Sequence, residues 1–217
     1  MTKKPKLTGG LIWAIIGTIL VLLFIGGCTT YNGMITAEET VDQSWANVQS
    51  SYQRRLDLIP NLVQTVKGYA KHESGTLEGV TAQRTGNAVA DVEKAQQNLE
   101  NATDAVKSFN GPDSQAPTAS QYSNLDNAYR IYINAVHEAY PDLKANQNFL
   151  DLQVQLEGTE NRINTERNRY NSAVKEYNVK IRRFPNNIFA GIFGFDTKQP
   201  FAADQGAQNA PVVDFND

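Results

Sequence analysis

Apolar residues recur along most of this chain at steps of three and four positions, which is the spacing of one face of an α-helix. Four such stripes follow residue 30, and they run from Val41 to Ile59, from Leu62 to Val80, from Tyr122 to Val136 and from Leu152 to Phe184. No stretch of this region shows the sustained alternation of a strand. Helices with a single apolar stripe bury those stripes against one another. The pattern therefore predicts an all-α fold, an elongated up-and-down four-helix bundle.

Proline and glycine mark where the predicted helices begin and end. Pro60 suits the first turn of a helix, so the first bundle helix is expected to end or kink near Leu58. The second would then run for roughly 50 residues to the stop signal at Asn110-Gly111-Pro112, followed by a loop.

The later boundaries carry their own signals. Thr118, with Gln121 three residues later, resembles a capping box that opens the third helix, and Pro141 closes that helix. The fourth helix is expected from about Leu143 to Arg183, before Pro185.

An apolar run precedes the bundle. No charged residue occurs from Leu7 to Ala37, and the run that begins at Leu11 reaches the roughly 20 residues that cross a hydrocarbon core. Three lysines precede it, and no Lys or Arg follows until Arg54, which predicts a cytoplasmic N-terminus and a body on the outer, periplasmic side of a bacterial cell membrane. With no proline between Leu11 and Ile59, the anchor helix is free to continue into the bundle.

Three regions follow from these signals. Residues 1–30 form a cytoplasmic stub and membrane anchor, and residues 31–195 form the bundle with a C-terminal apolar hook. Residues 196–217 are rich in Ala, Gln, Asp and Asn and are expected to be a disordered tail.

The single cysteine stands where the apolar run ends. Ile25-Gly26-Gly27-Cys28 is similar to a bacterial lipobox, in which the signal is cleaved and the cysteine acylated. A retained transmembrane anchor, with Cys28 as a small apolar residue at a helix end, explains the same residues. Both interpretations tether the body to a membrane outside the cytoplasm.

Charge and composition exclude several functions. Of the net charge of −3, the first 30 residues contribute three lysines, so the other 187 residues hold 17 basic and 23 acidic groups. Such an acidic body without a basic run argues against binding to nucleic acid. Neither histidine completes the Glu-x-x-His motif of di-metal bundles, because position 69 is Tyr and position 134 is Asn. We expect no metal, no cofactor and, without a nucleophile elbow or phosphate loop, no enzyme activity.

Several charged residues fall on or beside the apolar stripes of two helices. They are Arg54, Arg55 and Asp57 at the expected end of the first bundle helix, and Glu157, Glu160 and Arg167 in the fourth. We expect an interhelical ion network that fixes register. A recognition corner, or an enzyme site that uses Arg54, Arg55, Asp57 and Glu160, is the alternative.

Two further features suggest contacts with partners. Asn171 and Asn178 lie seven residues apart and repeat one heptad position, where amides can specify register or oligomeric partners, although solvent exposure would also explain them. The hook from Phe184 to Phe195 is too short to span a membrane. It could fold back on the bundle, dip into a membrane interface or bind another subunit, mainly through Ile188, Phe189, Phe193 and Phe195.

The combination of an anchor with these helical motifs resembles the LemA family. The matching motifs in the first half are Tyr31-Asn32, Trp45 with Val48, Tyr52 to Val63 (YQRRLDLIPNLV), Val66 to Ala70 and His72-Glu73. Those in the second half are Leu156 to Ile163 (LEGTENRI), Arg169 to Asn171, Tyr177-Asn178, and Phe184-Pro185 through Phe195. The resemblance covers about residues 10–196 and leaves out the tail.

The resemblance implies a bacterial single-anchor protein with a helical body and no established reaction. It also hints at partners, because members are often encoded near membrane metalloproteases and one branch is associated with shaping intracellular membrane compartments. We therefore expect a non-enzymatic scaffold that binds the bilayer, itself as a homo-oligomer, or envelope proteins. A regulator of a membrane protease is the first alternative, and an uncharacterised enzyme is the second.

Overall fold

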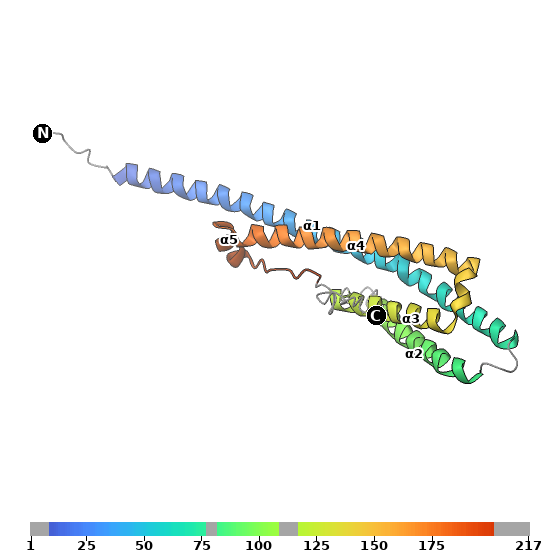
Figure 1. The fold of residues 1–217 in the computed structure, drawn as a ribbon. Coiled ribbons are helices and arrows are strands. Elements are labelled where there is room, and N and C mark those ends of the chain that lie inside the picture. Colours follow the sequence, from blue (N-terminus) through green and yellow to red (C-terminus); the bar gives the residue numbers. More distant parts are fainter. Residues whose placement is uncertain (1–8, 77–81, 109–116, 202–217) are drawn as a thin grey trace, which may run out of the picture. The chain divides into compact units, whose positions relative to one another are not determined.

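The computed structural model describes residues 9–76, 82–108 and 117–201, and within them it contains helices and no strand. In chain order these are α1 (Gly9–Thr76), α2 (Ala82–Lys107), α3 (Ala119–Ala139), the 3-10 helix η1 (Pro141–Ala145), α4 (Gln147–Arg182) and α5 (Asn186–Phe193), as Figure 1 shows. The predicted all-α fold is confirmed. The expected loop at residues 110–116 and most of the expected tail, residues 202–217, lie outside the described residues.

The helix end predicted near Leu58 is wrong. α1 continues through Pro60 to Thr76 and includes the apolar N-terminal run, so the predicted anchor and the first two predicted stripes share one helix. Proline removes the backbone hydrogen bond to the carbonyl four residues earlier. Here Pro60 is exposed, and buried Ile59 and Leu62 lie beside it. Packing of the buried face offsets the lost bond.

The predicted 50-residue second helix is also wrong. α1 ends at Thr76, and α2 begins at Ala82 and ends at Lys107. Gly75 and Gly79 are the sequence signals for an interruption between these helices, because glycine is unfavourable in helix interiors.

The start of α3 agrees with prediction, and the start of α4 does not. The Thr118 hydroxyl accepts from the Gln121 N–H while the Gln121 side chain reaches back to the Thr118 N–H, completing the capping box. After α3, Pro141 opens η1, and α4 begins at Gln147, four residues later than expected. Asn146 explains the shift, because its Oδ1 accepts from the Phe149 N–H at 3.2 Å and so acts as the N-cap.

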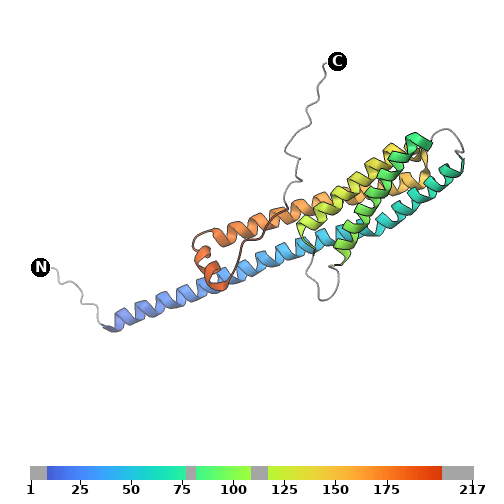
Figure 2. The same ribbon diagram turned by 90° about the horizontal axis from the view of Figure 1, so that it is seen from below.

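The chain divides into two compact units. The first unit takes its described residues from 1–46 and 168–200, and the second from 47–167 and 201–217. The second unit contains the C-terminal part of α1, α2, α3, η1 and the N-terminal part of α4, with α2 packed along α3 (Figure 2). Its buried apolar residues include Val48, Tyr52, Leu56, Leu62, Val66, Val92, Leu99, Tyr122, Leu125, Tyr132, Val136, Phe149, Leu156 and Ile163.

The first unit joins segments that are far apart in the sequence. Its core lies between the N-terminal part of α1, the C-terminal part of α4 and α5. The buried members are Met34, Val41, Ala173, Val174, Tyr177, Ile181 and Ala190, with Phe189 and Phe195 packed against them.

Residues 196–200, which were expected to begin the tail, are held against this core. Asn178 binds the Lys198 backbone twice, donating to its carbonyl at 2.8 Å and accepting from its N–H at 3.0 Å. The Lys198 ammonium pairs with Asp42 at 2.7 Å and Glu38 at 3.3 Å. These contacts fix residues 196–200, whose composition had indicated disorder.

Candidate functional site

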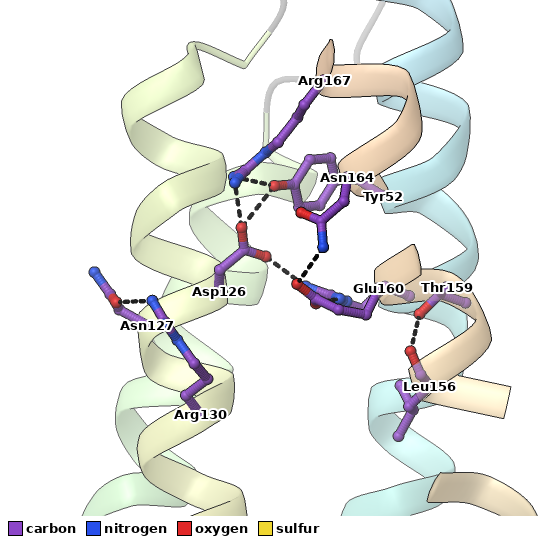
Figure 3. A network of polar contacts seen from close by, with 10 residues as sticks. Tyr52, Asp126, Asn127, Arg130, Leu156, Thr159, Glu160, Asn164 and Arg167 are labelled. Atoms are coloured by element: carbon purple, nitrogen blue, oxygen red, sulfur yellow. Dashed lines mark hydrogen bonds and ion pairs between the residues drawn. The ribbon is translucent and has the colours of Figure 1, made fainter. Parts of the chain in front are cut away.

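A buried ion network joins α1, α3 and α4 in the second unit. Arg55, with no exposed surface, donates to Asp126 on α3 at 2.5 Å and to Glu160 on α4. Arg167, two turns beyond Glu160 on α4, donates to the other oxygen of Asp126 at 2.5 Å. Figure 3 shows the Asp126 side chain between the side chains of Arg167 and Glu160. The α3 carboxylate thus ties together the neighbouring helices on both sides.

Aromatic residues complete the network. The Tyr52 hydroxyl donates to Asp126 at 2.7 Å and accepts from Arg167, and its ring stacks on Tyr122 with centroids 4.0 Å apart. The Arg55 guanidinium lies 5.3 Å from the centroid of Tyr129. The Tyr52 and Tyr129 rings thus lie within cation–π distance of the Arg55 guanidinium.

Burial changes the acid–base behaviour of this network. It raises the pKa of the Tyr52 hydroxyl far above its usual 10, with a further rise from the Asp126 charge, so this hydroxyl remains a donor at neutral pH. Burial raises the pKa of Tyr122 to about 12. It also raises the pKa of Asp126, and the charges of Arg55 and Arg167 offset part of that rise.

An opening of about 490 Å³ leads to the network from the α3–α4 side. Asp126, Glu160 and Arg167 lie at its floor or wall, and the rest of the lining is Tyr129, Arg130, Gln153, Leu156, Glu157 and Asn164. Both charge signs lie close together in this opening. Among the residues that the structure describes, no group of three or more His, Cys, Asp or Glu is arranged to hold a metal ion.

The six charged residues named from the sequence separate into two groups. Arg55, Glu160 and Arg167 meet in the network. Arg54 and Asp57 lie on the exposed face of α1, where Asp57 accepts from Gln53 at 2.9 Å. Glu157 is exposed at the rim of the opening. Arg54 and Asp57 are therefore not part of the cluster that the enzyme hypothesis required.

Sequence reasoning missed Asp126. It lies four residues after Tyr122 and so shares the buried face of α3 with the Tyr122–Val136 stripe. A carboxylate on an apolar stripe is itself a signal, because charges are buried only with partners.

A second candidate surface lies in the first unit, where the apolar part of α1 meets α5. The large apolar side chains of the N-terminal run are exposed, among them Trp13 (75%), Leu22 (63%) and Phe24 (73%). The helix around them is long and apolar enough to cross a membrane. Exposed aromatic and aliphatic side chains on all sides are typical of a lipid-facing helix and unfavourable in water.

α5 packs against the end of this run. The Phe189 ring lies beside Gly27, where an added Cβ would meet Cε1 at 3.2 Å, and the Tyr31 ring meets Phe193 edge-on at 4.9 Å between centroids. Gly194 ends α5 in the left-handed conformation, which lets Phe195 turn back onto Tyr31.

The hook is thus divided between two faces. Phe189 and Phe195 pack on the core of the first unit, whereas Ile188 is 53% and Phe193 48% exposed. The sequence pattern placed Phe184 at the end of the fourth apolar stripe. In the structure it is 76% exposed, because α4 ends just before it.

The remaining candidates lie near the same core. Asn178 fixes Lys198, an intramolecular contact, and Asn171 is partly buried on the same helix. Cys28 is exposed on α1, which is helical on both sides of it.

A model of the LemA family matches residues 44–215. This chain belongs to the LemA family. The match begins after the apolar run, and it extends through the residues after 196 that the sequence resemblance had left out.

Relatives of this LemA-family chain include magnetosome proteins and a protein named LemA. Magnetosome protein MamQ 2 of Paramagnetospirillum magneticum is 26% identical over 92% of this chain and 74% of its own length. Magnetosome protein MamQ of Magnetospirillum gryphiswaldense is 25% identical over 90% and 74%. Protein LemA of Metamycoplasma hominis is 23% identical over 73% of this chain and 63% of its own. Family and relatives indicate a membrane-associated helical protein.

Proposed function

We propose that this LemA-family protein is a non-enzymatic scaffold, held in a membrane by α1, that assembles with further copies of itself. The observation that carries the proposal is α1, whose N-terminal turns expose apolar side chains while later turns of the same helix, from Met34 to Val66, are buried in the protein. One helix therefore serves both the lipid and the protein core. The relatives named magnetosome proteins support a role at a membrane.

Packing at Gly27 favours a retained anchor over a cleaved lipoprotein. Cleavage before Cys28 would remove Gly27, against which Phe189 packs, and would open the end of the first unit. Mass spectrometry of the mature protein tests this point. We expect the mass of the uncleaved chain, and a diacylated N-terminal Cys28 would refute the anchor.

The charge asymmetry supports a cytoplasmic N-terminus and a body on the outer, periplasmic side. Fusions of alkaline phosphatase and of green fluorescent protein to the C-terminus test the orientation. The first is expected to be active and the second dark, and the reverse pattern would overturn the proposed topology.

Self-assembly needs a contact surface on the body, and α4 offers one. Leu150 and Val154 lie one turn apart and are 38% and 68% exposed. Light scattering of the full chain in detergent is expected to give a mass of two or more copies. Val154→Lys should reduce that mass, and the neighbouring exposed position should tolerate Gln155→Lys as the matched control. A strict monomer without a co-purifying partner would refute the scaffold, and a membrane protease in stoichiometric amount would replace self-assembly with protease binding.

The ion network serves this function by fixing helix register. If so, Arg55→Ala and Glu160→Gln should lower the melting temperature and leave the assembled mass of the folded protein unchanged. Loss of a cellular function at full stability in either variant would instead support the enzyme hypothesis.

A further inference from the structure

We propose that α5 and the basic end of α4 form a second membrane contact, in which the outer face of α5 lies in the bilayer interface beside the anchor. This inference rests on the proposed anchoring by α1. Its first support is the division of α5 into two faces. Phe189 and Ala190 pack inward, whereas Ile188 and Ile192, one turn apart, are 53% and 69% exposed.

The position at which α5 packs along α1 indicates that the bilayer interface covers the outer face of α5. A helix that crosses about 30 Å of hydrocarbon uses roughly 20 residues. A span that begins at Leu11 ends at Thr30, and Gly27, which Phe189 touches, then lies within its last turn. A span that begins at Gly9, the first residue of α1, ends at Cys28, directly after Gly27. In either register α5 packs on α1 at the boundary between hydrocarbon and headgroups. Figures 1 and 2 show these two helices side by side.

The residues that lead into α5 are basic, and basic side chains interact favourably with the headgroups of an anionic membrane. Arg182 and Arg183 are exposed in the residues just before α5. Lys175, Lys180 and Arg183 line a depression of about 580 Å³ next to the start of α5, and the lining contains a single acidic residue, Glu176. Apolar residues flanked by Lys and Arg are typical of helices that lie in the interface of anionic bilayers.

Two exposed aromatic side chains lie at the two ends of α5. Phe184, at 76% exposure, precedes α5, and Phe193, at 48%, closes its last turn next to Tyr31. Rings at this level would lie among the headgroups and the first methylenes. Together with Ile188 and Ile192 they form a cluster within ten residues, whereas isolated exposed apolar residues are ordinary.

Tryptophan quenching in vesicles tests the contact with the full chain. The protein is reconstituted in phosphatidylcholine with about 30% phosphatidylglycerol, an anionic surface of the kind that attracts basic residues. Trp13 and Trp45 are replaced by Phe, and Ile192→Trp is introduced as the reporter. Ile131→Trp, at a 55% exposed position on α3, is the matched control, and circular dichroism verifies that both are folded.

We expect lipids brominated near the headgroup to quench the Ile192→Trp emission about two-fold or more relative to Ile131→Trp, with a blue-shifted maximum. Equal quenching of the two reporters would overturn the interface contact. A blue shift without lipid quenching would also overturn it and would assign this face to a second copy.

The parent chain with Trp13 retained separates the two proposals. If Trp13 is quenched while Ile192→Trp is not, the anchor stands and the α5 contact fails. If Trp13 is not quenched either, the proposed anchoring fails with it.

Discussion

Replacement of Asp126 by alanine is the strongest single test of the buried network. Its carboxylate accepts from Arg55, Arg167 and Tyr52, and Arg55 has no exposed surface. Removing one partner of a buried ion pair costs roughly 3–5 kcal/mol, because the other charge is left uncompensated. Glu160 cannot take over this role, since its side chain is 47% exposed and solvent screens its charge.

That loss is a large share of the 5–15 kcal/mol that stabilises a typical protein. For a chain of this size it corresponds to a fall in Tm of roughly 6–20 °C. The measurement is urea and thermal unfolding of the full chain in detergent, followed by far-UV circular dichroism. Asp57→Ala is the matched control, because Asp57 is an exposed carboxylate bound to Gln53, and it should change stability by about 0.5 kcal/mol or less.

If Asp126→Ala lowered the free energy of unfolding by no more than Asp57→Ala, the Asp126 carboxylate would not be compensating buried charges. A triple variant refines the result. Arg55→Met, Asp126→Leu and Arg167→Met together remove the buried charges and leave only Glu160, which is 47% exposed, and buried pairs replaced by apolar residues are often neutral in stability. Recovery in this triple variant would assign the network to helix register, and failure to recover would assign it a net stabilising energy.

Three further predictions concern other parts of the chain. Gly27→Leu, whose side chain would meet the α5 ring that packs there, should increase hydrogen exchange in α5, whereas Gly26→Leu, with open space around it, should not. Asn178→Ala removes two hydrogen bonds to Lys198 and should speed tryptic cleavage after that lysine several-fold. Burial, aided by the Lys144 charge, lowers the pKa of His137. As the pH falls, the unfolded chain therefore takes up this proton at a higher pH than the folded chain does, and the free energy of unfolding should decrease from about pH 7 to 5.5. The decrease should be smaller in His137→Gln.

Each of these predictions has a result that contradicts it. Equal exchange in the two glycine variants would show that α5 does not depend on close contact with α1. An unchanged rate of cleavage after Lys198 would mean that its ion pairs with Glu38 and Asp42 suffice. The same pH slope in His137→Gln as in the parent would assign that slope to other groups.

Periodicity predicted the helices well because it reports which face is buried, and it predicted their ends poorly. Pro60 has the same local signal whether it begins a helix or lies within one. The outcome depends on whether residues on either side, such as Ile59 and Leu62, find a common neighbour to pack against. That neighbour belongs to distant parts of the chain, so the continuity of α1 could not be read from the segment alone.

The network could be predicted in part for a related reason. Arg55, Glu160 and Arg167 stand out because they lie on or beside apolar stripes, and the same test applied to α3 would have found Asp126. Arg54 and Asp57 are adjacent in sequence to buried positions yet point to solvent. Lys198, which holds residues 196–200 to Glu38 and Asp42, lies in a polar segment whose composition gives no sign of a fixed structure.

The composition of the first unit also determines when it can form during synthesis. Its two parts are separated by the 121 residues from 47 to 167, so Met34 and Val41 on α1 have no core until α4 and α5 have been made. At roughly 5–20 residues per second, that interval lasts on the order of ten seconds or more. Throughout it these turns of α1 present an unsatisfied apolar face, and a chain truncated before residue 168 would keep that face permanently. Completion of the first unit therefore depends on residues 168–200, although its α1 part is made first.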